Sequence, residues 1–509
     1  GTTQQSGGTL TIAGATSLNQ LTQSGGDLSQ SSGTFGATTA NLTGGTASIG
    51  GAATIDSLSV GGSNIATLSG TLGNSGGTNL GGNGSLTLNG ASEISGLSQS
   101  GGTLNGTGAL TLNGTSTWNG GTWSGSGGTT IADTASLQIS GNVTLAGRSI
   151  LNLGSVSVGS AGSSAAVELD GTSNLSNQGV LSLQNGAISN TDAVSGTLNV
   201  TNTASATINK TTAAAVTLGA TLDNQGTLDV GAGVLTVAAF AHSENAGTIT
   251  LGNGGTLSTA GSALTNSGSI NLSGGTLASG DVSNRGSISG TGVLNLGAGT
   301  LTNAGTLSPG GGGATGSLSI TGNYAQTSAG RLNAELASSS DYDRLSASGT
   351  ISVSGQLAIS QLNGYEPSAV TSHTILTCTG SAACLSGSFA QISYPANGNL
   401  TPVYAAQSFS LDLLDQIKRW ITDANGNWED GANWSGGSAP TASQDALIDR
   451  GSASPIVSIS GSAEAHDLRL SESIQLGGSG ALTLSGGLNA GQSATGSIEL
   501  TNVSSLSVT

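Results

Sequence analysis

The sequence is poor in charged residues, and this excludes several classes of partner. Charged residues make up only 7% of the 509 residues, and nine basic side chains against 26 acidic ones give a net charge of −17. Lys and Arg form no cluster anywhere in the chain. A nucleic-acid groove or an anionic membrane surface needs local positive charge, so we expect neither as a partner. No apolar run approaches the length of a membrane span, so we expect no direct membrane insertion by this segment.

Methionine and a signal peptide are also missing. The chain begins at Gly1 inside repeat-like sequence and stops at Thr509 inside strand-like sequence. A secretory signal would carry a basic start and an apolar core, and neither is present. We therefore expect an internal piece of a longer secreted protein that lies outside the cell or on its surface.

Cysteine is nearly absent, and the two that occur are close together. Cys378 and Cys384 lie in the segment Cys-Thr-Gly-Ser-Ala-Ala-Cys, a spacing suited to a disulfide that closes a small loop. The alternative is two free thiols. A chain of extracellular character favours the disulfide, which would contribute roughly 2 kcal/mol for so short a loop.

What the chain does contain is a repeated motif, Asn-x-Gly-x-(Leu/Ile). Its spacings are 21, 21, 18 and 19 residues, and it occurs at Asn224, Asn245, Asn266, Asn284 and Asn303. A second motif, Gly-x-Leu, recurs once in each period of the first, so each period contains at least two short strands separated by glycine turns. Such a period predicts one coil of a solenoid, in which stacked coils bury a continuous core of aliphatic residues.

The hydrophobic pattern predicts an all-β protein. The 87 glycines alone would suggest a disordered linker, but Leu, Ile and Val recur with period two in segments such as Gly7-Gly-Thr-Leu-Thr-Ile12. That alternation is typical of strands with one buried face. Helix signals are nearly absent.

Three stretches of different composition suggest three domains. Residues 1–308 contain no proline and form the regular repeats, whereas all six prolines lie beyond them. Residues 309–415 are expected to be an irregular β-rich cap or transition domain, because an uncovered solenoid end invites aggregation. Residues 416–509 are expected to be a Trp-containing cap followed by the first coils of a second β-helix, with Trp420, Trp428 and Trp434 filling its first coil.

The first stretch begins with a variant of the coil. Gly84-Ser-Leu-Thr-Leu-Asn-Gly90 returns 24 residues later as Gly108-Ala-Leu-Thr-Leu-Asn-Gly114, which predicts longer coils there. Trp118-Asn-Gly-Gly-Thr-Trp123 occupies the same frame as Gln99-Ser-Gly-Gly-Thr-Leu104. Two interpretations of Trp118 and Trp123 remain open: they fill a wider coil, or they form a sugar-stacking platform that binds ligand.

Several motifs together resemble those of a known family. The Asn-x-Gly-x-Leu coils, Gly322-Asn-Tyr-Ala-Gln326, Leu362-Asn-Gly-Tyr-Glu-Pro367 and the Asn-Trp pairs between Asn427 and Asp445 are similar to passenger regions of autotransporters and two-partner-secretion exoproteins, the filamentous-haemagglutinin-like adhesins. The resemblance implies a right-handed parallel β-helix, export across an outer membrane, and a role in adhesion or biofilm matrix. It implies no catalytic residues.

Enzyme chemistry finds little support in the sequence. His242, His373 and His466 are far apart and none has a metal-ligand spacing, so we expect surface or loop histidines without a shared role. An enzyme acting on polysaccharide needs paired carboxylates, or acidic residues with Arg or Lys, on neighbouring coils. The regular repeats hold only three basic residues, Arg148, Lys210 and Arg285. We therefore expect a protein that is not an enzyme and has no organic cofactor.

Calcium is the one metal for which the sequence contains a candidate binding site. Asp423-Ala-Asn-Gly-Asn427 copies the first ligands of a calcium loop, but Trp428 and Trp434 replace its turn glycine and bidentate glutamate. A looser site built from Asp423, Asn425, Asn427 and Asp430 remains a hypothesis. Asp341 and Asp343 form a weaker candidate.

The asparagine motif has a structural interpretation and a binding interpretation. We expect each Asn amide to stack on the amide of the next coil, which would satisfy polar groups that the turn buries. At about 4.8 Å per coil, roughly fourteen coils in residues 1–308 would extend on the order of 65 Å.

Two functions of different class follow. The first is an extracellular bacterial adhesin or matrix rod that links cells, host or neighbouring surfaces, or exopolysaccharide, with self-association included. The alternative is a β-helix protein that binds or degrades polysaccharide.

Overall fold

The chain folds almost entirely into β-strands. The computed structural model describes residues 1–189, 197–367, 371–394, 400–413, 417–450, 455–470, 474–489, 498–501 and 505–508. Strands account for 62% of the residues, and the described ranges contain no α-helix. Successive coils pair in parallel with about 21 residues per turn, which makes a parallel β-solenoid of the right-handed β-helix type. The predicted fold class is confirmed.

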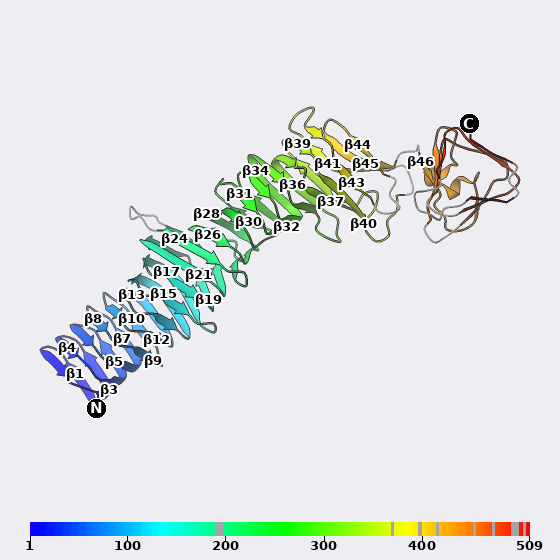
Figure 1. Cartoon of the computed structure of the whole chain (residues 1–509). Helices are drawn as coiled ribbons and strands as arrows, with labels where there is room; N and C mark the ends of the chain where they lie inside the picture. The colour runs from blue at the N-terminus through cyan, green and yellow to red at the C-terminus, as the bar shows by residue number, and fades with distance from the viewer. Residues whose placement is uncertain are drawn as a thin grey trace. The chain divides into compact units, whose positions relative to one another are not determined.

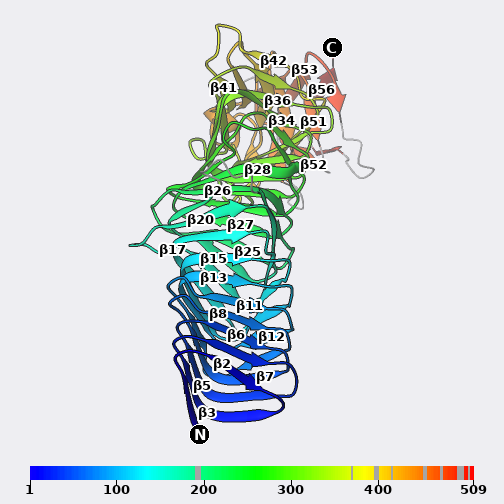
Figure 2. The ribbon, with the colours of Figure 1, turned by 90° about the vertical axis from the view of Figure 1, so that its left-hand side faces the viewer.

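The chain divides into two compact units. Unit 1 comprises residues 1–306 with 320–322, and unit 2 comprises residues 307–319 and 323–509. Figure 1 shows the coils of unit 1 in succession from blue to green. Figure 2 shows the same coils stacked one upon another, each crossing the column as a nearly flat turn.

Each coil of unit 1 contributes strands to three rows, where a row is a set of strands from successive coils that pair in parallel. The later coils illustrate the three rows. On the first row, β27 (Thr227–Val230) pairs with β29 (Thr248–Gly252), which pairs with the start of β32 (Ser269–Ala278). The start of β28 (Gly233–Asn245) pairs with β30 (Gly255–Ser258) on the second row. On the third, the end of β28 pairs with β31 (Leu264–Asn266), and β31 with β33 (Val282–Asn284).

The core of unit 1 consists of aliphatic ladders, one inward residue from each coil. Ile249 pairs with Ile270, and Ile270 pairs with Ile288 on β34 (Ser287–Asn303). These side chains have no exposed surface, whereas the next residues outward, such as Ser269, are only half-buried. The inward and outward register that the sequence predicts is therefore confirmed. Burial of this kind stabilises by roughly 25 cal/mol per Å² of apolar surface.

The asparagines form a continuous ladder of amide hydrogen bonds. Asn224 Nδ2 donates to Asn245 Oδ1 at 2.7 Å, and Asn245 Nδ2 donates to Asn266 Oδ1 at 2.8 Å. All members are fully buried, and the structural interpretation is confirmed. The ladder is longer than the predicted motif, because Asn152, Asn177 and Asn202 precede Asn224 in it. Its last bond is donated by Asn284 Nδ2 to Asn303 Oδ1.

The expected long coils near the start are wrong. Leu86 on β11 (Ser85–Leu88) pairs with Leu104, 18 residues later, and not with Leu110. Leu110 begins β14 (Leu110–Leu112) and pairs with Ser92. The two similar segments therefore lie in different rows of the coil, and their separation of 24 residues is not the period. Longer coils occur elsewhere, where Asn152, Asn177 and Asn202 stand 25 residues apart.

Unit 2 begins with parallel coils and then turns antiparallel. The strand β37 (Arg331–Leu336) pairs in parallel with β40 (Gln356–Gln361), and β38 (Arg344–Ala347) with β41 (Thr371–Cys378). Two antiparallel strands then extend β41: β45 (Ser408–Leu413) lies beside β41, and β44 (Thr401–Tyr404) lies beside β45.

The last part of unit 2 is a second small stack of parallel coils. Its strands form three parallel sheets. The first consists of β46 (Ile417–Arg419), β48 (Asp445–Ile448), β51 (Leu468–Leu470) and β54 (Leu488–Asn489). The second consists of β47 (Gly426–Asn427), β49 (Ile456–Ser458), β52 (Ile474–Gly477) and β55 (Ile498–Thr501), and the third of β50 (Ser462–Ala465), β53 (Ala481–Leu484) and β56 (Ser505–Val508). Trp420, Trp428 and Trp434 are buried together at its start with residues such as Ile448. These tryptophans fill the first coil, as the sequence predicts. No helix in the described ranges has the length and apolar character needed to cross a bilayer.

Candidate binding surfaces

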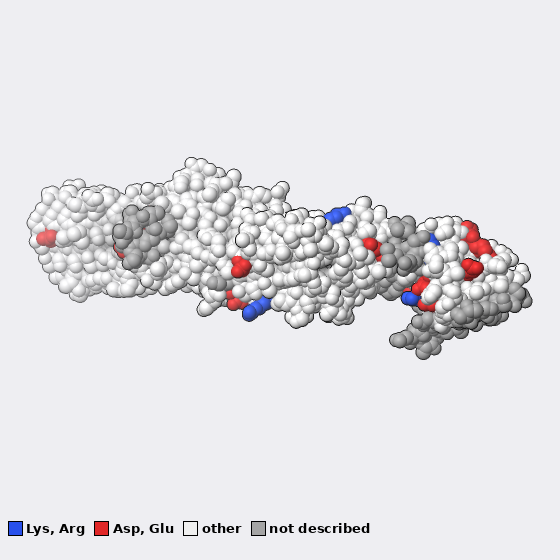
Figure 3. Space-filling view, turned by 90° about the horizontal axis from the view of Figure 1, so that it is seen from above, with Lys and Arg blue, Asp and Glu red and all other residues white. Residues whose placement is uncertain are grey.

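The outer surface of unit 1 carries rows of small neutral polar side chains. Parallel pairing aligns Asn41, Ser59, Asn79, Ser98 and Thr117, one from each of five consecutive coils, and none of them is buried. Figure 3 shows how thinly charge is spread, with isolated acidic and basic side chains among uncharged ones. Hydroxyl and amide groups both donate and accept hydrogen bonds, so such a row can contact a polymer rich in hydroxyl groups.

A shallow hollow beside this row is centred on Gly73. Thr54, Gly73, Glu93 and Thr111 occupy one register position on four coils, and Gly73 leaves a gap between the side chains of Thr54 and Glu93. The surrounding wall includes Ala52, Ala91 and Ala109 on one side and Asn74, Ser75, Ser95 and Asn113 on the other. A Cβ atom at Gly73 would have no neighbour within 4 Å, so the space is open. Glu93 is the only charged residue among these lining residues.

Trp118 and Trp123 are core residues, and the ligand-binding interpretation of them is wrong. Neither side chain has exposed surface. Their rings stack on each other inside one coil, 4.3 Å between centroids, and Trp123 Nε1 donates to Gln99 Oε1 at 2.7 Å. Trp118 pairs with Gln99 and Trp123 with Leu104, as the sequence frame predicts. The two indoles occupy core positions where the preceding coil has Gln99 and Leu104, so no sugar ring can reach them.

The four residues of the calcium hypothesis each contact a different protein group. Asp423 Oδ1 lies 2.7 Å from a guanidinium nitrogen of Arg450, and Asn425 Oδ1 accepts from the Ile456 amide at 2.8 Å. The Asn427 amide donates to the Ser460 hydroxyl, and Asp430 caps the short 3-10 helix η1 (Gly431–Asn433). No side-chain hydrogen bond among the described residues joins two of the four. The calcium site remains a hypothesis that this arrangement does not favour.

The weaker acidic pair holds the glycine-rich segment that follows Pro309. Asp343 Oδ1 and Oδ2 accept from the Gly316 and Glu335 amides at 2.8 and 2.9 Å, and Asp341 accepts from the Thr315 hydroxyl. Asp343 is 1% exposed. Burial raises the pKa of its carboxyl to about 7, against the opposite effect of the two amide donors. Asp343 therefore fixes this loop from within the protein, and Asp341 contacts it at the exposed surface.

The two cysteines are joined in a disulfide. Cys378 ends β41, and its sulfur is bonded to that of Cys384, with both residues buried. The enclosed loop is also tied to the neighbouring chain, because the Cys378 amide donates to the Gln407 carbonyl and the Gln407 amide donates to the Ser381 carbonyl.

Loss of this disulfide is expected to loosen only the loop. In Cys378→Ser, hydrogen exchange should rise across residues 378–384 and the free energy of unfolding of unit 2 should fall by about 2 kcal/mol. The far-ultraviolet circular dichroism of the coils should not change, because stacking depends on neighbouring strands. Thiol titration of protein purified without reductant should detect no free thiol, and two reactive thiols would contradict the pairing.

Of the three Lys and Arg side chains of unit 1, Arg148 and Lys210 are buried, whereas Arg285 is exposed. Arg148 has no exposed surface and donates to Thr129 Oγ1 at 2.7 Å and to the Ser124 and Gly128 carbonyls. Burial lowers the pKa of its guanidinium to about 10. Lys210 is equally buried and donates to the Ala232 carbonyl. Both ions bind carbonyl groups of neighbouring coils and are out of reach of an acidic polysaccharide.

One of the three histidines differs from the expectation of surface or loop residues. His242 is exposed, but His373 is fully buried, with Nδ1 donating to the Leu411 carbonyl at 3.3 Å and Nε2 lying 3.1 Å from the Tyr365 hydroxyl. Burial lowers the pKa of His373. His466 belongs to a cluster of charged groups. The expectation of a surface or loop position is therefore wrong for His373 alone, because His466 is exposed and lies between two strands.

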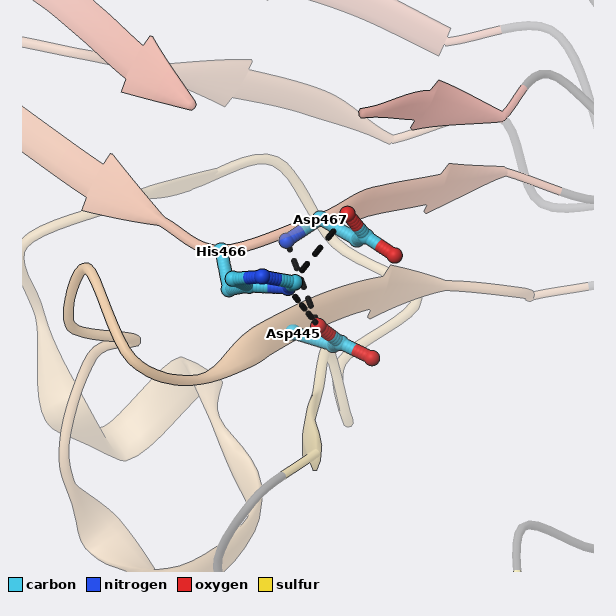
Figure 4. Close-up of side chains that lie close together, drawn as sticks. All are labelled: Asp445, His466 and Asp467. Carbon is cyan, nitrogen blue, oxygen red and sulfur yellow. Dashed lines mark hydrogen bonds and ion pairs between the residues drawn. The ribbon is translucent and has the colours of Figure 1, made fainter. Parts of the chain in front are cut away.

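The cluster around His466 lies on consecutive coils of the second stack in unit 2. Asp445 begins β48 (Asp445–Ile448), and Asp467 directly precedes β51 (Leu468–Leu470), with which β48 pairs. Figure 4 shows both carboxylates turned toward the His466 ring. Arg469 Nη2 lies 2.7 Å from Asp445 Oδ2. The amide of Gly487, followed by the His466 and Arg469 charges, lowers the pKa of Asp467.

Comparison with known proteins adds no assignment. The chain matches no protein-family model, and no curated protein is detectably similar to it.

Proposed function

We propose that this chain is part of an extracellular bacterial adhesin or biofilm-matrix protein. Its coils would act as a scaffold that presents polar rows to neighbouring cells, host surfaces or exopolysaccharide. The observation that carries this proposal is the aligned row of neutral polar side chains from Asn41 to Thr117, which repeats once per coil. A repeating row suits weak contacts made many times, because linked contacts raise the overall affinity without any new contact.

The distribution of charge supports adhesion over catalysis. Glycosidic cleavage commonly uses two carboxylates on opposite sides of the bond. The lining residues of the hollow include the single carboxylate Glu93. Arg148 and Lys210 contact backbone carbonyls in the interior. These residues suit retention of a polymer more than its cleavage.

The alternative function is a β-helix that binds or degrades polysaccharide, and the hollow over Gly73 is the feature that favours it. A sugar ring placed there would lie between Thr54 and Glu93, where hydroxyl and carboxylate oxygens accept hydrogen bonds from sugar hydroxyls. Charge-assisted hydrogen bonds to a carboxylate are the stronger kind. Binding without cleavage at this place is also compatible with the adhesin.

A panel of immobilised bacterial exopolysaccharides tests both functions. We expect the chain to be retained by at least one polymer of the panel and to release neither reducing ends nor unsaturated products from it. Accumulation of products would favour the degrading alternative. Failure to be retained by any polymer, together with failure to bind or aggregate bacterial cells, would contradict the adhesin.

Filling the hollow is expected to weaken this retention. Gly73→Gln should lower the affinity for the retained polymer at least tenfold, because the new side chain would occupy the gap beside Glu93 without a backbone clash. Gly128→Gln is the matched control, since Gly128 is exposed, has no atom within 4 Å of its Cβ position, as Gly73 has none, and lies outside the hollow. Circular dichroism should show that both variants fold. Equal affinity of the two variants would place the contact elsewhere.

A further inference from the structure

We propose that Asp445, His466 and Asp467 form a binding site for a divalent transition-metal ion, with zinc as the expected occupant. One oxygen of each carboxylate and Nδ1 of the imidazole all lie within 4.8 Å of one another. Among the described residues, this is the one group of three or more His, Cys, Asp or Glu side chains whose ligand atoms converge in this way. The proposal is independent of the adhesive function.

The distances between the ligand atoms fit a tetrahedral site. His466 Nδ1 lies 3.1 Å from Asp445 Oδ1 and 3.4 Å from Asp467 Oδ1. Metal–ligand bonds of about 2.0–2.1 Å separate two ligands of a tetrahedron by about 3.3 Å. The two carboxylate oxygens lie within 4.8 Å of each other, so an ion that replaces the proton on Nδ1 can contact all three atoms once the carboxylates close on it. The His466 side chain is 52% exposed, which leaves room for water as the fourth ligand.

The charges at the site also favour a cation. Asp445 and Asp467 stand at equivalent positions of neighbouring coils, where two like charges repel. Arg469 neutralises one of them: its Nη2 lies 2.7 Å from Asp445 Oδ2 and 3.5 Å from Asp467 Oδ2. The guanidinium thus occupies the Oδ2 side of both carboxylates, and both Oδ1 atoms face the imidazole. One net negative charge remains for a metal ion.

The ligands are held in place before any ion binds. The Gly487 amide donates to Asp467 Oδ1 at 2.7 Å, and the Asp467 amide donates to Asp445 Oδ1 at 3.2 Å. Gly486 leaves the space that these side chains need, because a Cβ atom there would lie 2.3 Å from Asp467 Oδ1 and 2.9 Å from His466 Cε1. Partners of this kind orient metal ligands and increase affinity.

The donor set selects the kind of metal. Imidazole nitrogen with carboxylate oxygens suits zinc and related first-row ions, whereas calcium and magnesium prefer six or more oxygen ligands. The site differs from the calcium hypothesis at Asp423, Asn425, Asn427 and Asp430 in both residues and chemistry. An ion bound here would link two consecutive coils of the second stack.

The proposal can be tested by isothermal titration calorimetry, in which zinc chloride is added to the metal-free full chain and the stoichiometry and affinity of binding are measured. We expect one zinc ion per chain, and an affinity at least tenfold lower in His466→Ala and in Asp467→Asn. His242→Ala is the matched control, because that histidine is exposed and lies in unit 1, and it should bind zinc as the unaltered chain does. No zinc binding by the unaltered chain, or equal binding by His466→Ala, would overturn the proposal.

Cobalt gives a readout that depends on coordination and not on stability. Addition of cobalt chloride to the metal-free chain should produce a saturable visible absorption band at one equivalent, and zinc should abolish it. The band should be missing in His466→Ala, whose circular dichroism should remain unchanged because the side chain is half-exposed. A band that persists in that variant, or tighter binding of calcium than of zinc, would refute the assignment.

Discussion

Replacement of Ile270 by aspartate is expected to lower the free energy of unfolding of unit 1 by at least about 4 kcal/mol. Ile270 has no exposed surface and lies between Ile249 and Ile288 in the aliphatic ladder. Aspartate would remove these contacts and leave a carboxylate without a partner in the core. Because each coil depends on its neighbours, the adjacent coils should lose protection as well. Urea unfolding followed by circular dichroism measures the loss, and hydrogen exchange locates it.

Ser269→Asp is the matched control, one residue away on the same strand. Ser269 points outward, where its hydroxyl donates to Thr248 Oγ1 at 3.0 Å. Loss of one partly exposed hydrogen bond should change stability by no more than about 1 kcal/mol. Equal destabilisation by the two aspartates would contradict the inward and outward register of the first row.

Repetition made the fold of unit 1 predictable from sequence. The asparagine motif recurs once per coil, and its aliphatic partner four residues later lies in the core each time, as Leu228 and Ile249 illustrate. The motif is also present at Asn177-Gln-Gly-Val-Leu181, within the ladder that continues to Asn152. Asn202 lacks the glycine and could be found only through the hydrogen bond that Asn177 donates to it.

Similarity of sequence gave the wrong coil length where two rows of one coil resemble each other. Gly84-Ser-Leu-Thr-Leu-Asn-Gly90 and Gly108-Ala-Leu-Thr-Leu-Asn-Gly114 are both strands with inward leucines. Strand propensity and hydrophobic alternation are the same in every row of a solenoid. Two similar segments can therefore lie in different rows or in the same row of successive coils, and these two properties do not distinguish the cases. The coil length is given by the backbone pairing of Leu86 with Leu104, and such pairing cannot be inferred from the amino-acid composition.

The candidate sites were hard to predict because their residues come from different coils. Asp445 and Asp467 are 22 residues apart, a separation that matches no short metal-ligand spacing but equals one coil of the second stack. Gly73 and Glu93 likewise meet only through register. For Trp118 and Trp123 the sequence predicted the strand pairing but left open whether the side chains are in the core or at the surface, and the structure places them in the core.

Asn245→Ala is expected to destabilise unit 1 by about 2–5 kcal/mol, because the asparagine ladder passes through this residue. Its Oδ1 accepts from Asn224 Nδ2 at 2.7 Å, and its Nδ2 donates to Asn266 Oδ1 at 2.8 Å. Alanine would leave both neighbouring amides with one partner fewer in a site without exposed surface. Each buried polar group that loses its partner costs about 1–3 kcal/mol. Urea unfolding of the full chain, followed by circular dichroism, measures the change.

An exposed pair of asparagines in the same unit serves as a control for the effect of burial on such a hydrogen bond. Asn199 Nδ2 donates to Asn174 Oδ1 at 3.2 Å on the outer surface, again between neighbouring coils. Water replaces the lost partner there, so Asn199→Ala should change stability by no more than about 0.5 kcal/mol. The same bond between the same two groups is thus expected to matter only where the coil excludes water. If both alanine variants were equally stable, the buried amides would not hold the coils together, and the aliphatic ladders alone would account for the stacking.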